Sequence, residues 1–295
     1  MSGILMKATS EKYKVSIIIP TYNSAETLEK CLKSIRSQSY PFYEIIIVDS
    51  FSNDDTLRIA KNFGARIIRQ KSNTAYARNI GILNSYGEYL LFIDSDQILS
   101  PSVVEECIKK CESGEAEMVI IPEIFIGKSF WGLCSAIWKN CYEFYIHGKD
   151  RKQKIRGEPR FFIRQEVVRA GLFNSDLLWG EDLALHTKLR KLNVKVALCK
   201  SKLYHCEPSS LKEIVTKNLR YGKSMNLFMQ QTRRQIVLPM IKNALLTLRE
   251  VSINFNKSPT ITCGCIFLLF LKVYALTVGF LLGVVGLKKN YNKGE

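Results

Sequence analysis

Two carboxylates separated by a single residue are the clearest chemical signal in this 295-residue chain. Asp94 and Asp96 come at the end of Tyr89–Asp94, a segment apolar enough to form a buried strand. A carboxylate there costs free energy unless it binds a cation or faces an open cleft. Two such groups in one loop can hold Mg²⁺ or Mn²⁺, and the ion can bridge a diphosphate. Because Asp-x-Asp also occurs in solvated turns, the pair needs support from the elements around it.

Strand and helix patterns alternate through the segment that ends at Asp96. Continuous apolar runs predict strands, and apolar residues spaced three or four apart predict helices. Strands that are apolar on both faces and alternate with helices form a mostly parallel sheet that helices cover on both sides. The sequence therefore predicts an α/β fold. The expected strands are Val15–Pro20, Glu44–Asp49, Ala65–Arg69 and Tyr89–Asp94, and the expected helices are Ala25–Ser37, Asp54–Phe63 and Ala75–Tyr86.

Polar residues follow three of these strands. In parallel sheets, ligands bind beyond the carboxyl ends of the strands. Three successive strands thus end in groups that can hold a nucleotide and a metal ion. These groups are Thr21, Tyr22 and Asn23, then Asp49, then Asp94, Ser95 and Asp96.

The order of elements is less regular after Pro101. A helix is expected to continue to Ser113, and a strand is expected at Glu117–Pro122. The aromatic stretch that follows fits either core packing or a surface that faces a membrane or an acceptor. It contains Phe130, Trp131, Trp138, Tyr142, Phe144 and Tyr145.

The segment Ile261–Leu287 has 27 residues, and Lys272 is its only formal charge. At about 1.5 Å per residue, a helix of this length can cross a bilayer. We expect a transmembrane helix here, or a tilted or re-entrant one because of Lys272 and the many small residues. Ile236–Leu248 has the pattern of an amphipathic helix that lies in the membrane interface.

The net charge of +16 is distributed unevenly. Met1–Leu185 holds 24 Lys and Arg against 23 Asp and Glu, whereas His186–Glu295 holds 19 against 4. Basic residues beside an apolar segment favour an anionic lipid surface. A nucleic-acid binder would spread its basic residues over the folded domain, so we expect a membrane partner and no nucleic acid.

The nine cysteines include no Cys-x-x-Cys pair, and two of them lie in the apolar C-terminal segment. Neither a disulfide framework nor a zinc site is indicated. Met1–Lys14 lacks the apolar core of a signal peptide. We therefore expect the folded part of the chain to stay in a reducing cytoplasm.

Several motifs, in order and spacing, resemble the family 2 glycosyltransferases, whose catalytic domain has a nucleotide-sugar-binding fold called GT-A. The resemblance covers about Val15–Ser224. Its motifs are Val15–Asn23 (VSIIIPTYN), Ile46–Asp49 (IIVD), Ala77–Gly81 (ARNIG) and Gly87–Asp96 (GEYLLFIDSD).

We accordingly expect a Rossmann-like GT-A domain followed by a membrane-associated helical region. The expected division is an N-terminal extension at 1–14, a catalytic domain at 15–225 with a nucleotide-binding half at 15–100 and an acceptor half at 101–225, interfacial helices at 226–260, a transmembrane or re-entrant helix at 261–287, and a basic tail at 288–295.

The resemblance also implies where a nucleotide-diphosphate sugar would bind. Thr21 and Asp49 would contact the base and ribose, and Arg78 would lie near the base or a phosphate. Surface exposure of Arg78 on a helix, and a strand-end cap at Asp49, are the structural alternatives. The implied donor site consists of Pro20, Thr21, Tyr22, Asn23, Asp49, Arg78, Asp94, Ser95 and Asp96, with Asp94 and Asp96 flanking Mg²⁺ or Mn²⁺. Many relatives have Asp where this chain has Ser50, so the nucleobase stays open.

The segment Gly180-Glu181-Asp182 looks like the family's acceptor motif. Asp182 would be the general base that deprotonates an acceptor hydroxyl, and like-charge repulsion from Glu181 could raise its pKa. In-line attack would invert the anomeric configuration. An acidic first turn that complements a helix dipole is the alternative.

Five further residues match positions that contact metal, phosphate or acceptor in some relatives. His205 would be a third metal ligand or a diphosphate contact, although a lone His is more often structural. Arg160 could pair with a phosphate bidentately. The remaining candidates for acceptor or phosphate contacts are Trp179, Tyr221 and Lys223.

These features together predict an inverting, metal-dependent transferase at the cytoplasmic face of a membrane. Its acceptor would be a hydroxyl of a lipid-linked or cell-surface glycan. The alternative is a polyprenyl-phosphate glycosyl synthase, whose phosphate acceptor needs no strong base. A non-catalytic nucleotide-sugar sensor should have lost one of Asp94, Asp96 or Asp182, and the chain has all three.

Overall fold

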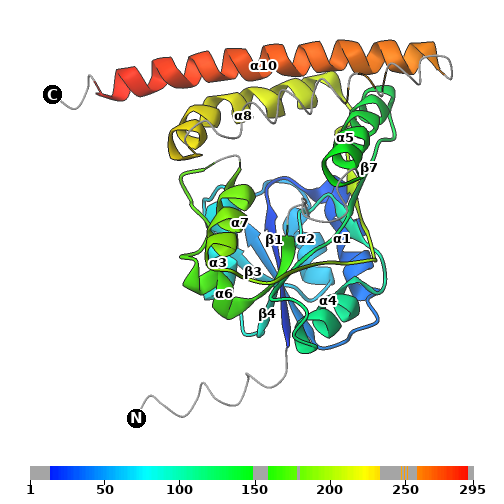
Figure 1. Ribbon diagram of the computed structural model, residues 1–295, viewed down its shortest axis with the longest axis vertical. Helices are drawn as coiled ribbons and strands as arrows, with labels where there is room; N and C mark the ends of the chain where they lie inside the picture. The colour runs from blue at the N-terminus through cyan, green and yellow to red at the C-terminus, as the bar shows by residue number, and fades with distance from the viewer. Residues whose placement is uncertain are drawn as a thin grey trace. The chain divides into compact units, whose positions relative to one another are not determined.

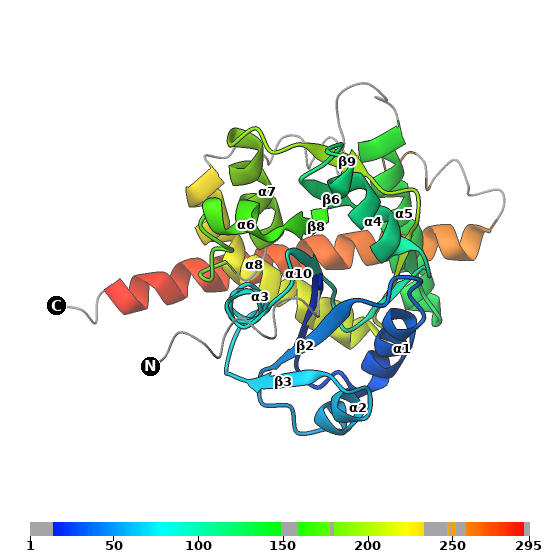
Figure 2. The ribbon, with the colours of Figure 1, turned by 90° about the horizontal axis from the view of Figure 1, so that it is seen from below.

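The computed structural model of the protein describes residues 14–148, 159–177, 180–232, 247, 249, 251 and 258–291. The chain forms two compact units. The first comprises Met1–Glu123, Ile155–Asp176 and Glu181–His205, and the second comprises Ile124–Lys154, Leu177–Gly180 and Cys206–Glu295. Figures 1 and 2 show the chain from two directions.

A seven-stranded sheet forms the centre of the first unit, in the order β3-β2-β1-β4-β8-β6-β9. Strands β3, β2, β1 and β4 pair in parallel, whereas β8 runs antiparallel to both of its neighbours. The predicted mostly parallel α/β fold is therefore confirmed. The strands are β1 (Val15–Thr21), β2 (Tyr43–Asp49), β3 (Arg66–Arg69), β4 (Tyr89–Phe92), β6 (Met118–Ile120), β8 (Pro159–Ile163) and β9 (Val196–Leu198).

Helices cover both faces of this sheet. Side chains alternate along a strand, so Ile17 and Ile19 of β1 enter one core and Ile18 enters the other. Figure 1 shows the two sets of helices on opposite sides of the sheet. The first core includes residues of α1 (Ala25–Arg36), α2 (Thr56–Asn62) and α4 (Val103–Glu112), and the second includes residues of α3 (Thr74–Leu83), α6 (Arg164–Arg169) and α7 (Glu181–Lys191).

The parallel register brings the ends of three strands to one edge of the sheet. Thr21 lies opposite Asp49, and Ile18 lies opposite Phe92, two residues before Asp94. The loops after β1, β2 and β4 therefore leave the same edge, as predicted for a ligand site. In Figure 2, β2 and β3 lie side by side, with α2 next to them.

A small second sheet has the order β5-β10-β7. Its strands, β5 (Gln97–Leu99), β7 (Glu123–Ile126) and β10 (Leu203–Cys206), were not expected from sequence. Strand β5 begins directly after Asp96 and pairs antiparallel with β10, so that Gln97 lies opposite His205. Residues more than a hundred positions apart are thus brought together beside Asp96.

The described residues of the second unit include three long helices, α5 (Phe130–Gly148), α8 (Leu211–Thr232) and α10 (Pro259–Tyr291). A core that includes Cys134 of α5, Ile214 of α8, and Cys265 and Leu268 of α10 joins them. Trp131 and Trp138 pack against this core, which agrees with the core-packing interpretation of the aromatic stretch.

Of the residues that the structure describes, only the helix over Pro259–Val284 is long and apolar enough to cross a membrane. It coincides with the predicted segment Ile261–Leu287. The expected amphipathic helix Ile236–Leu248 lies outside the described residues except at Thr247, as does the end of the basic tail.

Gly87, in the loop before β4, should be sensitive to substitution, because a Cβ there would lie 2.6 Å from the backbone nitrogen of Ser16. Gly87→Ala should lower the free energy of unfolding by about 2 kcal/mol, since main chain cannot easily move aside. Gly114→Ala is the matched control: φ at Gly114 is +73°, but an added Cβ meets nothing within 4 Å. We expect Gly114→Ala to lower the free energy of unfolding by about 1 kcal/mol. Equal losses in urea unfolding would contradict the proposed clash.

Candidate active site

Asp49 is fully buried at the end of β2 and is held by the neighbouring loops. It accepts hydrogen bonds from the Thr21 hydroxyl at 3.0 Å, from the Ser52 backbone N–H at 2.9 Å, and from the Ser52 hydroxyl. These bonds cap the strand end, as the structural alternative expected. Thr21 and Asp49 nevertheless lie together, so a joint contact with a ribose or base stays a prediction.

The loops after β1 and β2 leave two aromatic rings exposed. Tyr22 is 62% exposed and Phe51 is 53% exposed. Asn23 ties the two loops together, because its backbone N–H donates to Ser52 Oγ at 2.8 Å and its side-chain oxygen accepts from the Asn53 N–H at 3.0 Å. The Arg69 guanidinium covers one side of the Phe51 ring, 5.0 Å from its centroid. Sequence analysis missed Phe51 and Arg69.

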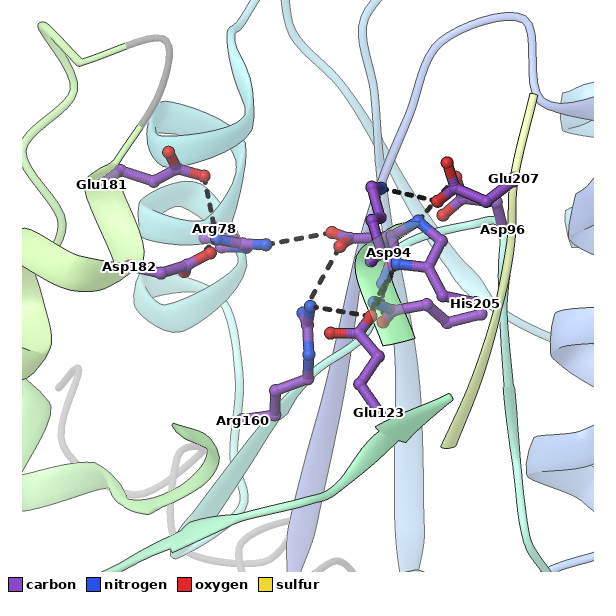
Figure 3. Close-up of polar contacts among 11 residues, drawn as sticks. Arg78, Asp94, Asp96, Glu123, Arg160, Glu181, Asp182, His205 and Glu207 are labelled. Atoms are coloured by element: carbon purple, nitrogen blue, oxygen red, sulfur yellow. Dashed lines mark hydrogen bonds and ion pairs between the residues drawn. The ribbon is translucent and has the colours of Figure 1, made fainter. Parts of the chain in front are cut away.

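Arg78 of α3 is only 1% exposed, so the surface-cation alternative is wrong. Its guanidinium pairs with Asp94 at 3.0 Å, with Glu181 at 3.2 Å, and closely with Asp182 (Figure 3). The Phe173 ring lies 5.3 Å below it. One buried cation therefore joins the predicted metal-binding loop to the predicted acceptor motif.

A chain of alternating charges continues on the other side of Asp94. Arg160 of β8 pairs with Asp94 at 3.3 Å and with Glu123 at 3.5 Å. His205 then lies between Glu123, 2.6 Å from Nδ1, and Asp96, 3.1 Å from Nε2 (Figure 3). The strand pairing of β10 with β5 is what places His205 at Asp96.

These contacts shift the pKa values of the cluster. Burial alone would raise the pKa of Asp94, but the charges of Arg78 and Arg160 outweigh it and hold that pKa well below its usual range. Burial likewise opposes ionisation of Glu123, yet Arg160 and His205 lower its pKa to about 2. Against burial, Asp96 and Glu123 raise the pKa of His205 to about 9. Asp94, Glu123 and His205 are therefore all charged at neutral pH.

The predicted acceptor motif begins α7, so Glu181 and Asp182 lie in its first turn. Their charges complement the helix dipole there, and they also pair with Arg78. Burial and the neighbouring Asp182 charge raise the pKa of Glu181 to about 7. The like-charge repulsion predicted within the pair thus raises the pKa of Glu181.

Two observations bear on ligands at this cluster. Arg78 Nε is buried without a hydrogen-bond partner among the described residues, so one buried donor is left for an oxygen. Within the same residues, no three His, Cys, Asp or Glu side chains are grouped to hold a metal ion. Carboxylates and an imidazole do suit Mn²⁺ or Mg²⁺, and a diphosphate would supply further oxygens. Such an ion would have to compete with the His205–Asp96 contact.

The other predicted site residues are distributed as follows. Ser95 Oγ donates to Ser24 Oγ at 3.0 Å. Ser24 follows Pro20 of β1 and the loop residues Tyr22 and Asn23. Tyr221 and Lys223 lie on α8 in the second unit, and Trp179 lies outside the described residues. Glu123 was missed, although a carboxylate just after the predicted strand Glu117–Pro122 is the signal that singled out Asp94.

Comparison with known proteins identifies the family. The model of glycosyl transferase family 2 matches residues 16–172, more than half of the chain. The chain belongs to the family 2 glycosyltransferases. It is 29% identical to glycosyltransferase AglE of Haloferax volcanii over 71% of this chain and 72% of AglE. Other curated relatives are matched over smaller shares of their own length.

Solved structures of two glycosyltransferases share the fold. Mannosyltransferase PcManGT from Pyrobaculum calidifontis, in complex with GDP-Man and Mn²⁺, aligns with a TM-score of 0.56 at 16% identity, over 92% of this chain and 86% of that chain. TarS of Staphylococcus aureus, in complex with UDP-GlcNAc, aligns with a TM-score of 0.54 at 15% identity, over 96% and 92%. The GT-A fold of this transferase is therefore confirmed.

The raised pKa of Glu181 should make the free energy of unfolding depend on pH. Between its unfolded value of 4.5 and its folded value of about 7, the folded state holds a proton that the unfolded state has lost. The free energy of unfolding should therefore fall as pH rises through that range. Glu181→Gln cannot titrate and should flatten this part of the profile, measured by urea unfolding at several pH values. Glu26→Gln, an exposed carboxyl in the first turn of α1, is the control. A profile unchanged by Glu181→Gln would contradict the pKa assignment.

Proposed function

We propose that this transferase moves a sugar from a nucleoside-diphosphate sugar, with inversion, to a hydroxyl of a lipid-linked or cell-surface glycan. The observation that carries the proposal is the position of Arg78. It pairs with Asp94 of the Asp-x-Asp loop and with Asp182 of the acceptor motif at once. One guanidinium thus contacts both Asp94, in the loop suited to bind a departing diphosphate through a metal ion, and Asp182, which is suited to take a proton.

The donor would lie along the carboxyl ends of β1, β2 and β4. Solved relatives hold GDP-Man or UDP-GlcNAc, which supports a nucleotide sugar here without choosing the base. The exposed rings of Tyr22 and Phe51 offer stacking surfaces close to Thr21 and Asp49. Buried Arg78 Nε and the guanidinium of Arg160 could donate to phosphate oxygens.

A divalent cation, Mn²⁺ or Mg²⁺, is proposed at Asp94 and Asp96. When bound, it would stabilise the negative charge that builds up on the leaving diphosphate. His205 is the third candidate, as a metal ligand or as a diphosphate contact. Asp96 and Glu123 raise the pKa of the imidazole, and a charged His205 would suit a diphosphate contact. A metal ion on Asp96 would remove part of this effect, so both roles are retained.

Asp182 is the proposed general base. As the acceptor oxygen forms its bond to the anomeric carbon, Asp182 would take the hydroxyl proton, and the bond to the diphosphate would break on the opposite face. A proton on Glu181 removes one negative charge beside the base at neutral pH. Arg78 fixes the position of the Asp182 carboxylate, which favours a productive orientation toward the hydroxyl.

Helix α10 and the charge of the second half of the chain bear on the acceptor and the location. The apolar helix α10 and the basic second half support a membrane-bound enzyme that acts on a lipid-linked or cell-surface glycan. The nine cysteines include no Cys-x-x-Cys pair and indicate no disulfide framework, which supports a cytoplasmic catalytic domain. A polyprenyl phosphate is the alternative acceptor.

Asp182→Asn should abolish transfer to a hydroxyl acceptor while donor affinity changes little. The lost proton acceptor acts mainly in the transition state, so we expect kcat to fall by roughly a thousandfold or more. Asp176→Asn, an exposed carboxylate of the same unit, should retain full activity. Normal transfer by Asp182→Asn would place the base elsewhere or indicate a phosphate acceptor.

Asp96→Asn should reduce turnover by orders of magnitude and leave the fold intact, because Asp96 is partly exposed and Asn keeps its shape. The assay is donor hydrolysis across a panel of UDP-, GDP- and dTDP-sugars with Mn²⁺ or Mg²⁺. Asp55→Asn, at an exposed ion pair, is the control. Full activity of Asp96→Asn, or of the wild type in EDTA, would rule out the metal assignment.

A further inference from the structure

Helix α10 has one packed face and one exposed apolar face. Cys265, Leu268, Ala275 and Gly279 are buried and lie three, seven and four residues apart, as one side of a helix requires. The opposite side exposes six large apolar side chains between Phe267 and Leu282, with Thr277 among them. We call it the apolar stripe: Phe267, Phe270, Val273, Tyr274, Leu281 and Leu282.

A buried charge network fixes which face of α10 is exposed. Lys272 Nζ donates to Ser135 Oγ of α5 at 2.8 Å, and the Ser135 hydroxyl donates to Glu207. Lys139 also pairs with Glu207, at 2.6 Å. The only formal charge of Ile261–Leu287 is thus turned toward α5, and the apolar stripe carries none.

Helix α8 lies against α10 with backbone contacting backbone. A Cβ at Gly222 would lie 2.2 Å from the Leu276 carbonyl oxygen, and one at Gly283 would lie 2.5 Å from the Lys223 carbonyl oxygen. Figure 1 shows the two helices side by side. Neither can therefore move along or away from the other without loss of this contact.

This pairing conflicts with a helix that crosses the bilayer. If α10 spanned, α8 would enter the hydrocarbon with it, and its exposed Lys212, Arg220 and Lys223 would lose their hydration. Charged side chains in the hydrocarbon are costly. Helix α10 also has 33 residues, about 50 Å at 1.5 Å per residue, against a hydrocarbon thickness of about 30 Å.

We propose that α8 and α10 form a monotopic membrane-binding surface in which α10 lies in the plane of an anionic bilayer. The apolar stripe would enter one leaflet, while the basic residues of α8 remain at the level of the headgroups. Charge favours this partner, since His186–Glu295 holds 19 Lys and Arg against 4 Asp and Glu. The inference rests on the proposed membrane association and replaces a spanning helix with an in-plane one.

Vesicle binding tests the apolar stripe. The double variant Phe270→Glu with Tyr274→Glu changes side chains that are 69% and 68% exposed, so the packed face is untouched. Co-sedimentation with mixed phosphatidylcholine–phosphatidylglycerol vesicles should weaken by roughly tenfold or more. The matched control, Leu83→Glu with Phe42→Glu, adds the same charge at exposed apolar positions of the first unit and should bind like wild type.

Intact vesicle binding by the stripe variant would overturn the proposal. Light scattering without lipid could instead show that the wild type is a dimer and the stripe variant a monomer. The stripe would then be an interface between copies. That result, too, would overturn the proposal. Thermal melting of the variant checks that its fold is retained.

Tag accessibility tests the orientation and needs no stripe variant. Full-length protein carrying a tag at each end is inserted into sealed vesicles and treated with protease from outside. An in-plane helix leaves both tags on the same side of the membrane. A spanning helix would separate them, because a continuous helix cannot turn back within the membrane. Tags on opposite sides would overturn the in-plane orientation and leave membrane association standing. Failure to bind any vesicle would overturn both the in-plane orientation and the membrane association. Donor hydrolysis tests the transferase activity independently.

Discussion

The buried guanidinium of Arg78 is the interaction on which the charged centre depends. It neutralises carboxylates from two segments about a hundred residues apart, Asp94 after β4 and the Glu181–Asp182 pair that begins α7. Carboxylates gathered at such low exposure would repel one another without it. Arg160 performs the same function between Asp94 and Glu123. The two cations therefore keep Asp94 and Glu123 ionised in a site where several carboxylates lie close together.

The fold brings these groups together from elements that are far apart in the sequence. Parallel pairing sets Thr21, Asp49 and Asp94 at one edge of the sheet. Helix α3 presents Arg78 to that edge, because the rest of its buried face packs into the core that contains Ile18. The antiparallel strand β10 adds His205 opposite Gln97. Motifs far apart in sequence thus act together only after the sheet and the small sheet have formed.

The sequence predicts strands, helices and site residues correctly where one physical pattern dominates. Apolar strands alternating with helices predicted β1 to β4, α1, α2 and α3, and carboxylates at strand ends predicted the loop at Asp94 and Asp96. The strands β5, β7, β9 and β10 were missed, since their pairing with distant partners, such as Gln97 with His205, follows from tertiary structure and not from a local pattern. The partners of Arg78 could not be predicted either, because ion pairs between distant segments follow from tertiary packing. An apolar run of 27 residues could not distinguish a spanning helix from one packed lengthwise on α8.

The most direct test is a crystal structure of the protein with a nucleoside-diphosphate sugar and Mn²⁺. We expect the diphosphate at the Asp94–Asp96 loop, with the ion on at least one of these carboxylates. The Asp182 carboxylate should face the anomeric carbon on the side opposite the leaving group and remain held by Arg78. A nucleotide bound away from the ends of β1, β2 and β4, with the pairs of Arg78 and Arg160 unchanged, would contradict the proposed active site.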